Sequence, residues 1–293
     1  MDKIKNWVEQ SPYSRFLGIR LEGLDESSAR LRLPYQDANS NPGQVLHGGC
    51  AASIGAIAGQ AIARAVLGEE AGPFHTAQMQ VSYLAAAIGE EVVAEARLLR
   101  RGRELCFIGI DVQTTEGKPI AQVMTTVRGR FGREDAAYYV SQGDHGESDP
   151  GVMGPQLHRV PFIGNRGIVV EHMTGGTSRL VMPQLEDNGD AAGGVHEGAV
   201  LALLDTTGAM ASWAESGPGS FKASTASMQV QILGPAPKGD LVAYGRCIQN
   251  DNEIYWSDVE VASVADGRVN ARGTVLYRIV KSTRPASARP PES

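Results

Sequence analysis

Cysteine is scarce in this sequence of 293 residues, and nothing in it suggests a metal site. The three cysteines, Cys50, Cys106 and Cys247, are far apart and belong to no CxxC pair or His/Cys group. Disulfide frameworks and zinc sites both need closer or more regular cysteine spacing. We therefore expect reduced thiols in the core of a cytoplasmic protein, and no bound metal.

The chain also has no excess of positive charge. Lys and Arg number 27 against 33 Asp and Glu, which gives a net charge of -6. Binding of nucleic acid or of an anionic membrane through bulk charge would favour the opposite balance. The first ten residues, MDKIKNWVEQ, lack the apolar core of a signal peptide, and we expect no membrane-spanning run. The composition is that of an ordinary globular protein, with neither a nucleic acid nor a membrane as partner.

What the sequence does contain is a long internal repeat. A shift of 149 residues, the separation of His47 from His196, aligns matching residues over roughly ninety positions without a gap. The clearest pairs are Gly18-Ile19 with Gly167-Ile168, Pro34 with Pro183, Thr76-Ala77 with Thr225-Ala226, Met79-Gln80-Val81 with Met228-Gln229-Val230, and Val93-Ala94 with Val242-Ala243. A constant shift over this length indicates two copies of one fold.

Each copy is expected to contain the same elements in the same order. Two short alternating segments precede a polar loop and a long apolar helix, and four strand-like runs follow. This pattern predicts an α+β protein of two tandem domains, each an antiparallel sheet wrapped around a central helix. The expected divisions are domain 1 at 1–132, a linker at 133–160, domain 2 at 161–281 and a disordered tail at 282–293.

One carboxylate stands in the second of these apolar helices. Asp205 lies in the segment 193–213, which is almost entirely apolar or small after His196-Glu197-Gly198. Burying an ionised carboxylate without partners costs several kcal/mol. Nine helical residues turn through roughly 900°, so His196 and Asp205 face opposite sides of the helix. The N-terminus of the helix and Asp205 are therefore offered to different surroundings, and the partners of Asp205 are not found within 193–213.

The residues around the first of the two helices resemble a known family. The stretch NSNPGQVLHGGCAASIGAIAGQAIA is similar to the Asn-x5-His-Gly-Gly-helix signature of hotdog-fold acyl-CoA thioesterases, in particular the phenylacetyl-CoA thioesterase branch. The flanking SPYSRFLGIRLEGLDESSARLRLP and VSYLAAAIGEEVVAEARLLRRGRELCFIGIDV are similar to it as well. The resemblance covers about 12–132 and, more weakly, about 160–281. It implies two hotdog units packed side by side, with thioester sites across their interface.

The resemblance also implies roles for individual residues. In the family, the Asn and the first helical Gly hold the thioester carbonyl, and an Asp nine residues after the His acts from the other unit as base or nucleophile. A Ser or Thr on the next strand helps to hold the attacking water. The carbonyl-binding residues would be Asn41, His47 and Gly48, and the acid half would be Asp205 with Thr225.

The remaining matches are incomplete, so the resemblance implies one composite site. Ala56 stands where domain 1 would carry its acid, and Asp190 and Glu197 stand where domain 2 would carry Asn and Gly. We expect the second pocket to be inactive in hydrolysis. An apolar environment should raise the pKa of Asp205, whereas the helix dipole should favour the charged form of Glu197.

Each of these residues also has a structural interpretation. Asp205 could be satisfied by a backbone donor, and Thr225 could be an ordinary β-branched strand residue. His47 is more readily a residue that orients its loop than a catalytic base. The run RLLRRGREL places Arg100, Arg101 and Arg103 around a hairpin turn. This turn is either a solvated surface or a clamp for the phosphates of CoA.

The internal repeat and the family resemblance together imply an acyl-CoA thioesterase that acts as a homodimer of double-hotdog chains. It would need no cofactor, because CoA enters as part of the substrate. Three alternatives stay open: a non-catalytic acyl-CoA-binding or regulatory protein, a hotdog hydratase or dehydratase, and a thioesterase for acyl carrier protein.

Overall fold

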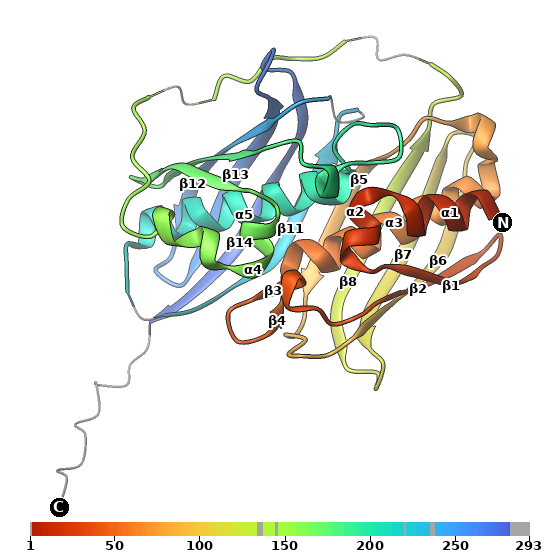
Figure 1. Ribbon diagram of the computed structural model, residues 1–293, viewed down its shortest axis with the longest axis horizontal. Coiled ribbons are helices and arrows are strands. Elements are labelled where there is room, and N and C mark those ends of the chain that lie inside the picture. The colour runs from red at the N-terminus through yellow and green to blue at the C-terminus, as the bar shows by residue number, and fades with distance from the viewer. Residues whose placement is uncertain (1, 134–136, 144–145, 220, 235–237, 282–293) are drawn as a thin grey trace, which may run out of the picture.

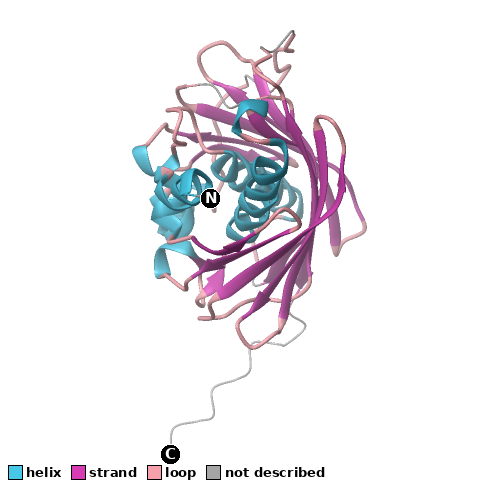
Figure 2. Cartoon of the chain, turned by 90° about the vertical axis from the view of Figure 1, so that its right-hand side faces the viewer, coloured by secondary structure: helices cyan, strands magenta, loops and turns pink. Residues whose placement is uncertain are grey.

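The computed structural model describes residues 2–133, 137–143, 146–219, 221–234 and 238–281. Within them, twelve strands form one antiparallel sheet that curves around two central helices (Figure 1 and Figure 2). The helices are α1 (Asp2–Gln10), α2 (Pro12–Leu17), α3 (Gly48–Leu67), α4 (Pro161–Asn165) and α5 (Glu197–Ser216). The strands of the first unit are β1 (Arg20–Leu24), β2 (Ser28–Leu33), β5 (Phe74–Tyr83), β6 (Val92–Arg101), β7 (Leu105–Thr114) and β8 (Pro119–Gly129). Those of the second unit are β9 (Val169–Thr174), β10 (Thr177–Met182), β11 (Phe221–Ile232), β12 (Leu241–Asn250), β13 (Ile254–Ser263) and β14 (Val269–Lys281).

The predicted repeat is present in three dimensions. The strand order is β1-β2-β6-β7-β8-β5 in the first unit, and β11-β14-β13-β12-β10-β9 continues it as the same pattern reversed. Gly18 and Gly167, which align in the repeat, both have a positive φ, at 78° and 65°. A Cβ at either glycine would press on Pro34 or Pro183, the next aligned pair. The expected α+β architecture of two tandem sheet-and-helix units is confirmed.

The two units share their sheet through a single strand pair. β5 runs antiparallel to β11, with Ser82 opposite Ser227 and Met79 opposite Val230. Because the strands are antiparallel, the end of β5 at Tyr83 lies beside the part of β11 that contains Thr225. The beginning of β5 lies toward the other end of β11. Each end of this pair therefore combines residues from both units.

The two central helices also meet across the boundary between units, and their first turns approach closely. A Cβ on Gly49 would lie 2.5 Å from the Cβ of Ala202 and 2.8 Å from its Cα. A Cβ on Gly198 would lie 2.7 Å from the Oγ of Ser53 and 2.6 Å from the Tyr13 ring. Glycine is therefore needed at both positions, because any side chain would force the helices apart.

Helix α3 departs from one sequence expectation. By length and composition alone it could cross a membrane, although we expected no such run; its mean hydropathy reaches 1.5 over an 18-residue window. The cause is its content of Ala, Ile and Gly, and 83% of that window is buried within the fold. The apolar side chains of α3 therefore pack against the sheet and α5.

The segment expected to be a linker is partly ordered. Residues Gly154–Arg159 form a 3-10 turn, and Ser141 Oγ donates a hydrogen bond of 3.0 Å to Glu260 in β13. The expected disordered tail, 282–293, lies outside the described residues. A short hairpin, β3 (Ser40–Asn41) with β4 (Val45–Leu46), leads into α3.

Candidate active site

Asp205 is buried in the middle of α5, with a partner on the sheet. Its side chain is 4% exposed, and the hydroxyl of Thr225 in β11 donates a 2.7 Å hydrogen bond to its Oδ1. Burial raises the pKa of Asp205 from 3.8 to about 6, and the Thr225 hydrogen bond opposes part of that rise. The carboxylate is thus a stronger base than an exposed aspartate, and it is still ionised at neutral pH.

Gly48, at the start of α3, faces Asp205 from the other unit. A Cβ placed on Gly48 would lie 2.9 Å from Oδ2 of Asp205. As the first residue of its helix, Gly48 has no intrahelical acceptor for its N–H, and it is partly exposed. The positive end of the α3 dipole adds to this donor. A backbone N–H without an intrahelical acceptor and a basic carboxylate therefore lie close together between the two units.

His47 caps α3 and is electrically neutral. Its Nδ1 accepts a 2.9 Å hydrogen bond from the N–H of Gly49, and burial lowers its pKa to about 3. The ring stacks on Phe162 of α4, with 4.2 Å between the ring centroids. His196 repeats the arrangement, since its Nδ1 accepts from Gly198 and its ring stacks on Tyr13. At neutral pH this environment suits a helix cap, not a residue that exchanges protons.

Asn41 is close in sequence to the helix start, but no described residue forms a hydrogen bond with its side chain. It is partly buried in β3 and pairs through its backbone with Val45 of β4. Its amide is therefore able to bind a ligand.

Sequence reasoning did not single out two tyrosines that lie close to Asp205. The hydroxyl of Tyr83, at the end of β5, donates to the carbonyl oxygen of Gly48 at 3.1 Å. Tyr277 pairs directly with Thr225 across β14 and β11, and its hydroxyl accepts from the indole of Trp213 at 3.3 Å. The nearby charge of Asp205 adds to the burial that raises the pKa of both tyrosines, in the case of Tyr277 to about 12. Both hydroxyls therefore stay protonated at neutral pH.

The second inter-unit pocket is small, and the side chain of Glu197 lines it. Its cavity has a volume of about 80 Å³ and is lined in part by Ala56, Asp190 and Glu197. Oε2 of Glu197 accepts hydrogen bonds of 3.0 Å from Gln60 Nε2 and from the backbone N–H of Thr76. The first residue of the central helix in the second unit therefore has a hydrogen-bonded side chain, where the first unit has Gly48.

The pKa expectation for Glu197 is wrong in direction. We expected the helix dipole to favour its charged form, but its pKa is raised, chiefly by burial. The hydrogen bonds from Thr76 and Gln60 and the charge of Arg64 oppose the rise without cancelling it. The side chain turns inward between α3 and β5, and the cost of desolvation there exceeds the effect of the dipole.

The structure separates the arginine hairpin from Asp205. Three arginines expected to contact CoA phosphates lie on the surface of the β6–β7 hairpin: Arg100 and Arg101 at the end of β6, and Arg103 in the turn. In the sheet, Arg101 pairs with Cys106, and Cys106 pairs with Val127. Val127 in turn pairs with Thr76, the residue that binds Glu197. The hairpin therefore belongs to the end of the sheet that holds the second pocket.

The equivalent turn of the second unit lies at the Asp205 end and carries no arginine. Thr225 pairs with Tyr277, which pairs with Tyr255. Tyr255 pairs with Asn250 at the start of the turn from β12 to β13. The turn sequence is NDNE, and its Glu253 pairs with Arg278 of the neighbouring strand β14.

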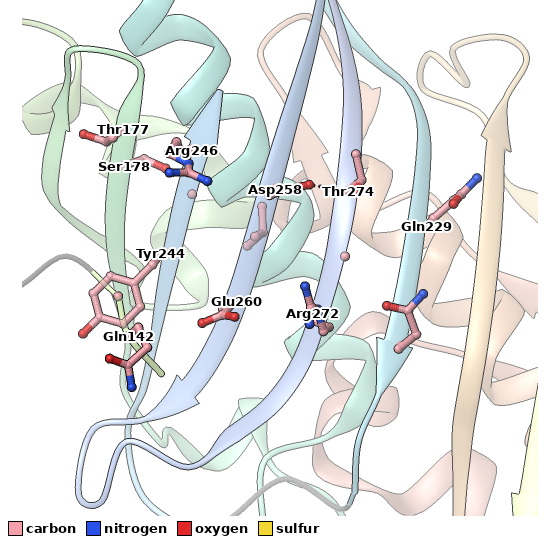
Figure 3. Close-up of a pocket in the computed structure, with 15 residues that line it drawn as sticks. Gln142, Thr177, Ser178, Gln229, Tyr244, Arg246, Asp258, Glu260, Arg272 and Thr274 are labelled. Atoms are coloured by element: carbon pink, nitrogen blue, oxygen red, sulfur yellow. Dashed lines mark hydrogen bonds between the residues drawn. The ribbon is translucent and has the colours of Figure 1, made fainter. Parts of the chain in front are cut away.

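A cavity of about 680 Å³ is lined by neither Asp205 nor Glu197 (Figure 3). It sits on the outer face of the second unit's sheet, where opposite charges pair across strands: Asp258 with Arg246, and Glu260 with Arg272. None of the residues predicted from the sequence as site residues lines it.

The comparisons with known proteins identify the family of the chain. A family model described as the acyl-CoA thioesterase N-terminal domain matches residues 36–130. A Halobacterium salinarum protein named "Putative esterase VNG_1336C" is 31% identical over 131 residues, which are 43% of this chain and 86% of that protein. Acyl-coenzyme A thioesterase 13 of Mus musculus is 33% identical over 93 residues, which are 31% of this chain and 64% of that protein.

A solved structure extends the likeness to both units. The structure of a conserved protein with a hot dog fold from Alicyclobacillus acidocaldarius matches with a TM-score of 0.63 at 15% identity. The match covers 90% of this chain and 96% of that one, and at this identity it shows the fold alone. The family model matches the first unit, and the internal repeat relates the second unit to it. The chain belongs to the hotdog-fold thioesterases, as a tandem double hotdog.

Proposed function

We propose that this protein hydrolyses an acyl-CoA thioester to a carboxylic acid and free CoA at one composite site between its two units. The observation that carries the proposal is the approach of Asp205, on α5, to Gly48, at the first turn of α3. A base and a carbonyl-binding donor that converge from two units are the two groups that thioester hydrolysis requires.

The geometry supports a sequence of steps in which water is the nucleophile. The thioester carbonyl oxygen accepts from the Gly48 N–H, with the Asn41 amide as a second donor. Asp205 removes a proton from a water molecule, whose oxygen attacks the carbonyl carbon. Negative charge on the carbonyl oxygen is stabilised by the Gly48 N–H and the α3 dipole. When the intermediate collapses, the C–S bond breaks and the thiolate of CoA leaves with the proton held by Asp205.

Thr225 and His47 support these groups. The Thr225 hydroxyl fixes one oxygen of Asp205, which leaves Oδ2 directed toward Gly48. His47 holds the first turn of α3 through the N–H of Gly49 and leaves the N–H of Gly48 free. No step needs a cofactor, because CoA enters as part of the substrate.

The second pocket has no part in this proposal. A side chain at Glu197 occupies the helix start that would have to receive the carbonyl, and Ala56 supplies no acid. We propose that this pocket has become a structural joint between the units.

A thiol-release assay over a panel of acyl-CoAs tests the proposal. Asp205→Asn should lower kcat by a factor of about 10² to 10⁴, the range for loss of a general base. The same variant should still bind a non-hydrolysable thioether analogue of acyl-CoA. Ala56→Asp is the matched control, because it adds a carboxylate at the equivalent position beside Glu197; it should add no activity.

Three results would contradict the proposal in different ways. A wild-type protein that binds the thioether analogue but releases no thiol from any acyl-CoA is a binding protein. Full activity in Asp205→Asn would place the chemistry elsewhere. Release from acylated carrier protein but not from acyl-CoA would identify a different substrate class.

We further propose that two chains associate into a homodimer in the cytoplasm. The outer face of the first unit's sheet exposes large apolar side chains, Leu99 at 54% and Met124 at 49%. Light scattering in solution should give twice the mass of the chain, and Met124→Lys should reduce it toward the monomer value.

A further inference from the structure

We propose that Tyr83 is a positioning residue of the hydrolytic site: its hydroxyl holds the first turn of α3, and its ring keeps water away from Asp205. The proposal rests on the function proposed above and adds a residue to it. Tyr83 ends β5 and lies in the first unit, so it reaches the site from the same side as Gly48.

The hydroxyl of Tyr83 binds Gly48, the residue proposed to receive the thioester carbonyl. Tyr83 Oη donates to the carbonyl oxygen of Gly48 at 3.1 Å. A carbonyl has two lone pairs, so it can accept this bond together with the usual bond from the next helical turn. The bond ties the first residue of α3 to the sheet. The direction of the Gly48 N–H, which must meet a developing oxyanion, depends on that orientation.

The ring of Tyr83 lies near the carboxylate of Asp205. Carbon atoms of the Tyr83 ring lie 3.4 Å from the place where a Gly48 Cβ would stand, and Oδ2 of Asp205 lies 2.9 Å from the same place. The ring and the carboxylate therefore border one small volume in front of Gly48. A ring in that place excludes water from one side of Asp205.

Desolvation decides the behaviour of Asp205 because its titratable neighbours in the described part of the chain are neutral. They are Cys50 from α3, Tyr83 from β5 and Tyr277 from β14, and each has a pKa raised above its ordinary value. Thr225 from β11 contributes a hydrogen bond but no charge. With no cation against it, Asp205 responds mainly to how much water reaches it.

The internal repeat supplies a natural contrast. The shift of 149 residues places Ile232 at the position of Tyr83, and Ile232 lines the second pocket. There the helix begins with Glu197 instead of a glycine. The hydroxyl is thus present in the pocket that has Gly48 and Asp205 and absent from its counterpart. Because both units form the same strand and helix, the fold itself does not require the tyrosine.

Two substitutions separate the two roles. Tyr83→Phe keeps the ring and removes the hydroxyl; kcat should fall by a factor of about 3 to 10, the effect of one hydrogen bond, with KM changed less than about twofold. The acid limb of the pH–rate profile should stay where it is in the wild type. Tyr83→Leu should also admit water, so its acid limb should move to lower pH by about one unit. Tyr139→Phe, which removes a hydroxyl that contacts Glu260 on the outer face, is the control and should match the wild type.

Carbon-13 NMR of the Asp205 carboxyl gives a readout that does not depend on turnover. The signal is assigned by its loss in Asp205→Asn, and its titration midpoint should be lower in Tyr83→Leu than in wild type or Tyr83→Phe. Wild-type kcat in Tyr83→Phe, or an unchanged Asp205 midpoint in Tyr83→Leu, would overturn the proposal for Tyr83 while the hydrolytic function stands. If the wild type releases no thiol from any acyl-CoA, the proposed function fails, and the positioning role fails with it.

Discussion

Gly48 and Asp205 come from different units, yet a Cβ on the glycine would lie 2.9 Å from Oδ2 of the aspartate. The start of α3 and the middle of α5 therefore approach one another across the boundary between the two units, and the proposed hydrolytic site lies at this approach.

Gly48→Ala should strongly slow hydrolysis without unfolding the protein. The new methyl group meets the end of a side chain, which can move, but the movement displaces Asp205 and blocks the approach to the Gly48 N–H. We expect kcat/KM to fall on the order of 10²-fold, the size of effect seen when an oxyanion donor is lost.

Gly49→Ala provides the contrast one residue later. Its methyl group would meet the backbone of Ala202 at 2.8 Å, so the two helices must separate. Overpacking of this kind costs about 1–3 kcal/mol of stability. Thermal unfolding should therefore report a lower Tm for Gly49→Ala and a nearly unchanged one for Gly48→Ala. The opposite result would mean that the first turns of the helices are not packed as described.

The pKa of Asp205 should set the pH dependence of activity and of the part of the stability that this residue contributes. Its folded-state pKa of about 6 lies above the ordinary 3.8, so the ionised form is the one that burial disfavours. The rate should fall about tenfold per pH unit below this value as the base becomes protonated. The contribution of Asp205 to stability follows the reverse course: it is fully present below pH 4 and is lost as the pH rises through 6. The buried neutral rings of His47 and His196 act in the opposite direction, so the contribution of Asp205 is measured as the difference between wild type and Asp205→Asn. The loss that follows from this shift is roughly 2–3 kcal/mol.

Asp205→Asn checks that sign. The variant keeps an acceptor for Thr225 but cannot ionise, so it should be more stable than wild type at pH 7.5 and equal to it at pH 3.5. Urea unfolding at the two pH values measures the difference. A variant that is less stable than wild type at pH 7.5 would show that Asp205 is held by partners that favour its charge.

Glu197→Gln should separate stability from catalysis. The pKa of Glu197 is also raised by burial, so the neutral amide should again stabilise the fold above the range in which the glutamate ionises. An amide oxygen can still accept from the Thr76 N–H. Thiol release should stay within about twofold of wild type, because this pocket lies at the far end of the β5–β11 pair. A loss of activity as large as that of Asp205→Asn would mean that the second pocket takes part in the reaction.

The fold could be predicted from the sequence because it depends on periodicity and on the repeat. The pairing of Gly48 with Asp205 was implied by the resemblance to hotdog-fold thioesterases, and the turn of the helix between His196 and Asp205 is consistent with it. Tyr83 was missed because its counterpart is Ile232, so the repeat gave no match there. Its contact with Gly48 depends on where β5 ends against α3. The Phe162 stack on His47 could have been anticipated, since the shift that aligns the histidines also aligns Tyr13 with Phe162.

Two expectations depended on tertiary information that no local pattern contains. The pKa of Glu197 was judged from its place at a helix N-terminus, whereas packing against Gln60 and Thr76 buries it. The arginine hairpin was recognised from its charge, but its distance from Asp205 depends on strand register. Arg101 pairs through Cys106 and Val127 with Thr76, and not with the row that contains Thr225.

Strand register therefore leads to a prediction for the hairpin itself. Replacing Arg100, Arg101 and Arg103 together by Gln should leave KM for acyl-CoA within about twofold, because the turn lies at the end of the sheet opposite to Asp205. If these side chains instead bound the phosphates of CoA at the working site, loss of charge-assisted hydrogen bonds would weaken binding by about 1.5–3 kcal/mol for each bond. KM measured at low and high salt distinguishes the two cases. A KM that rises more than tenfold in the triple variant at low salt, and that loses its salt dependence there, would show that the hairpin does reach the bound CoA.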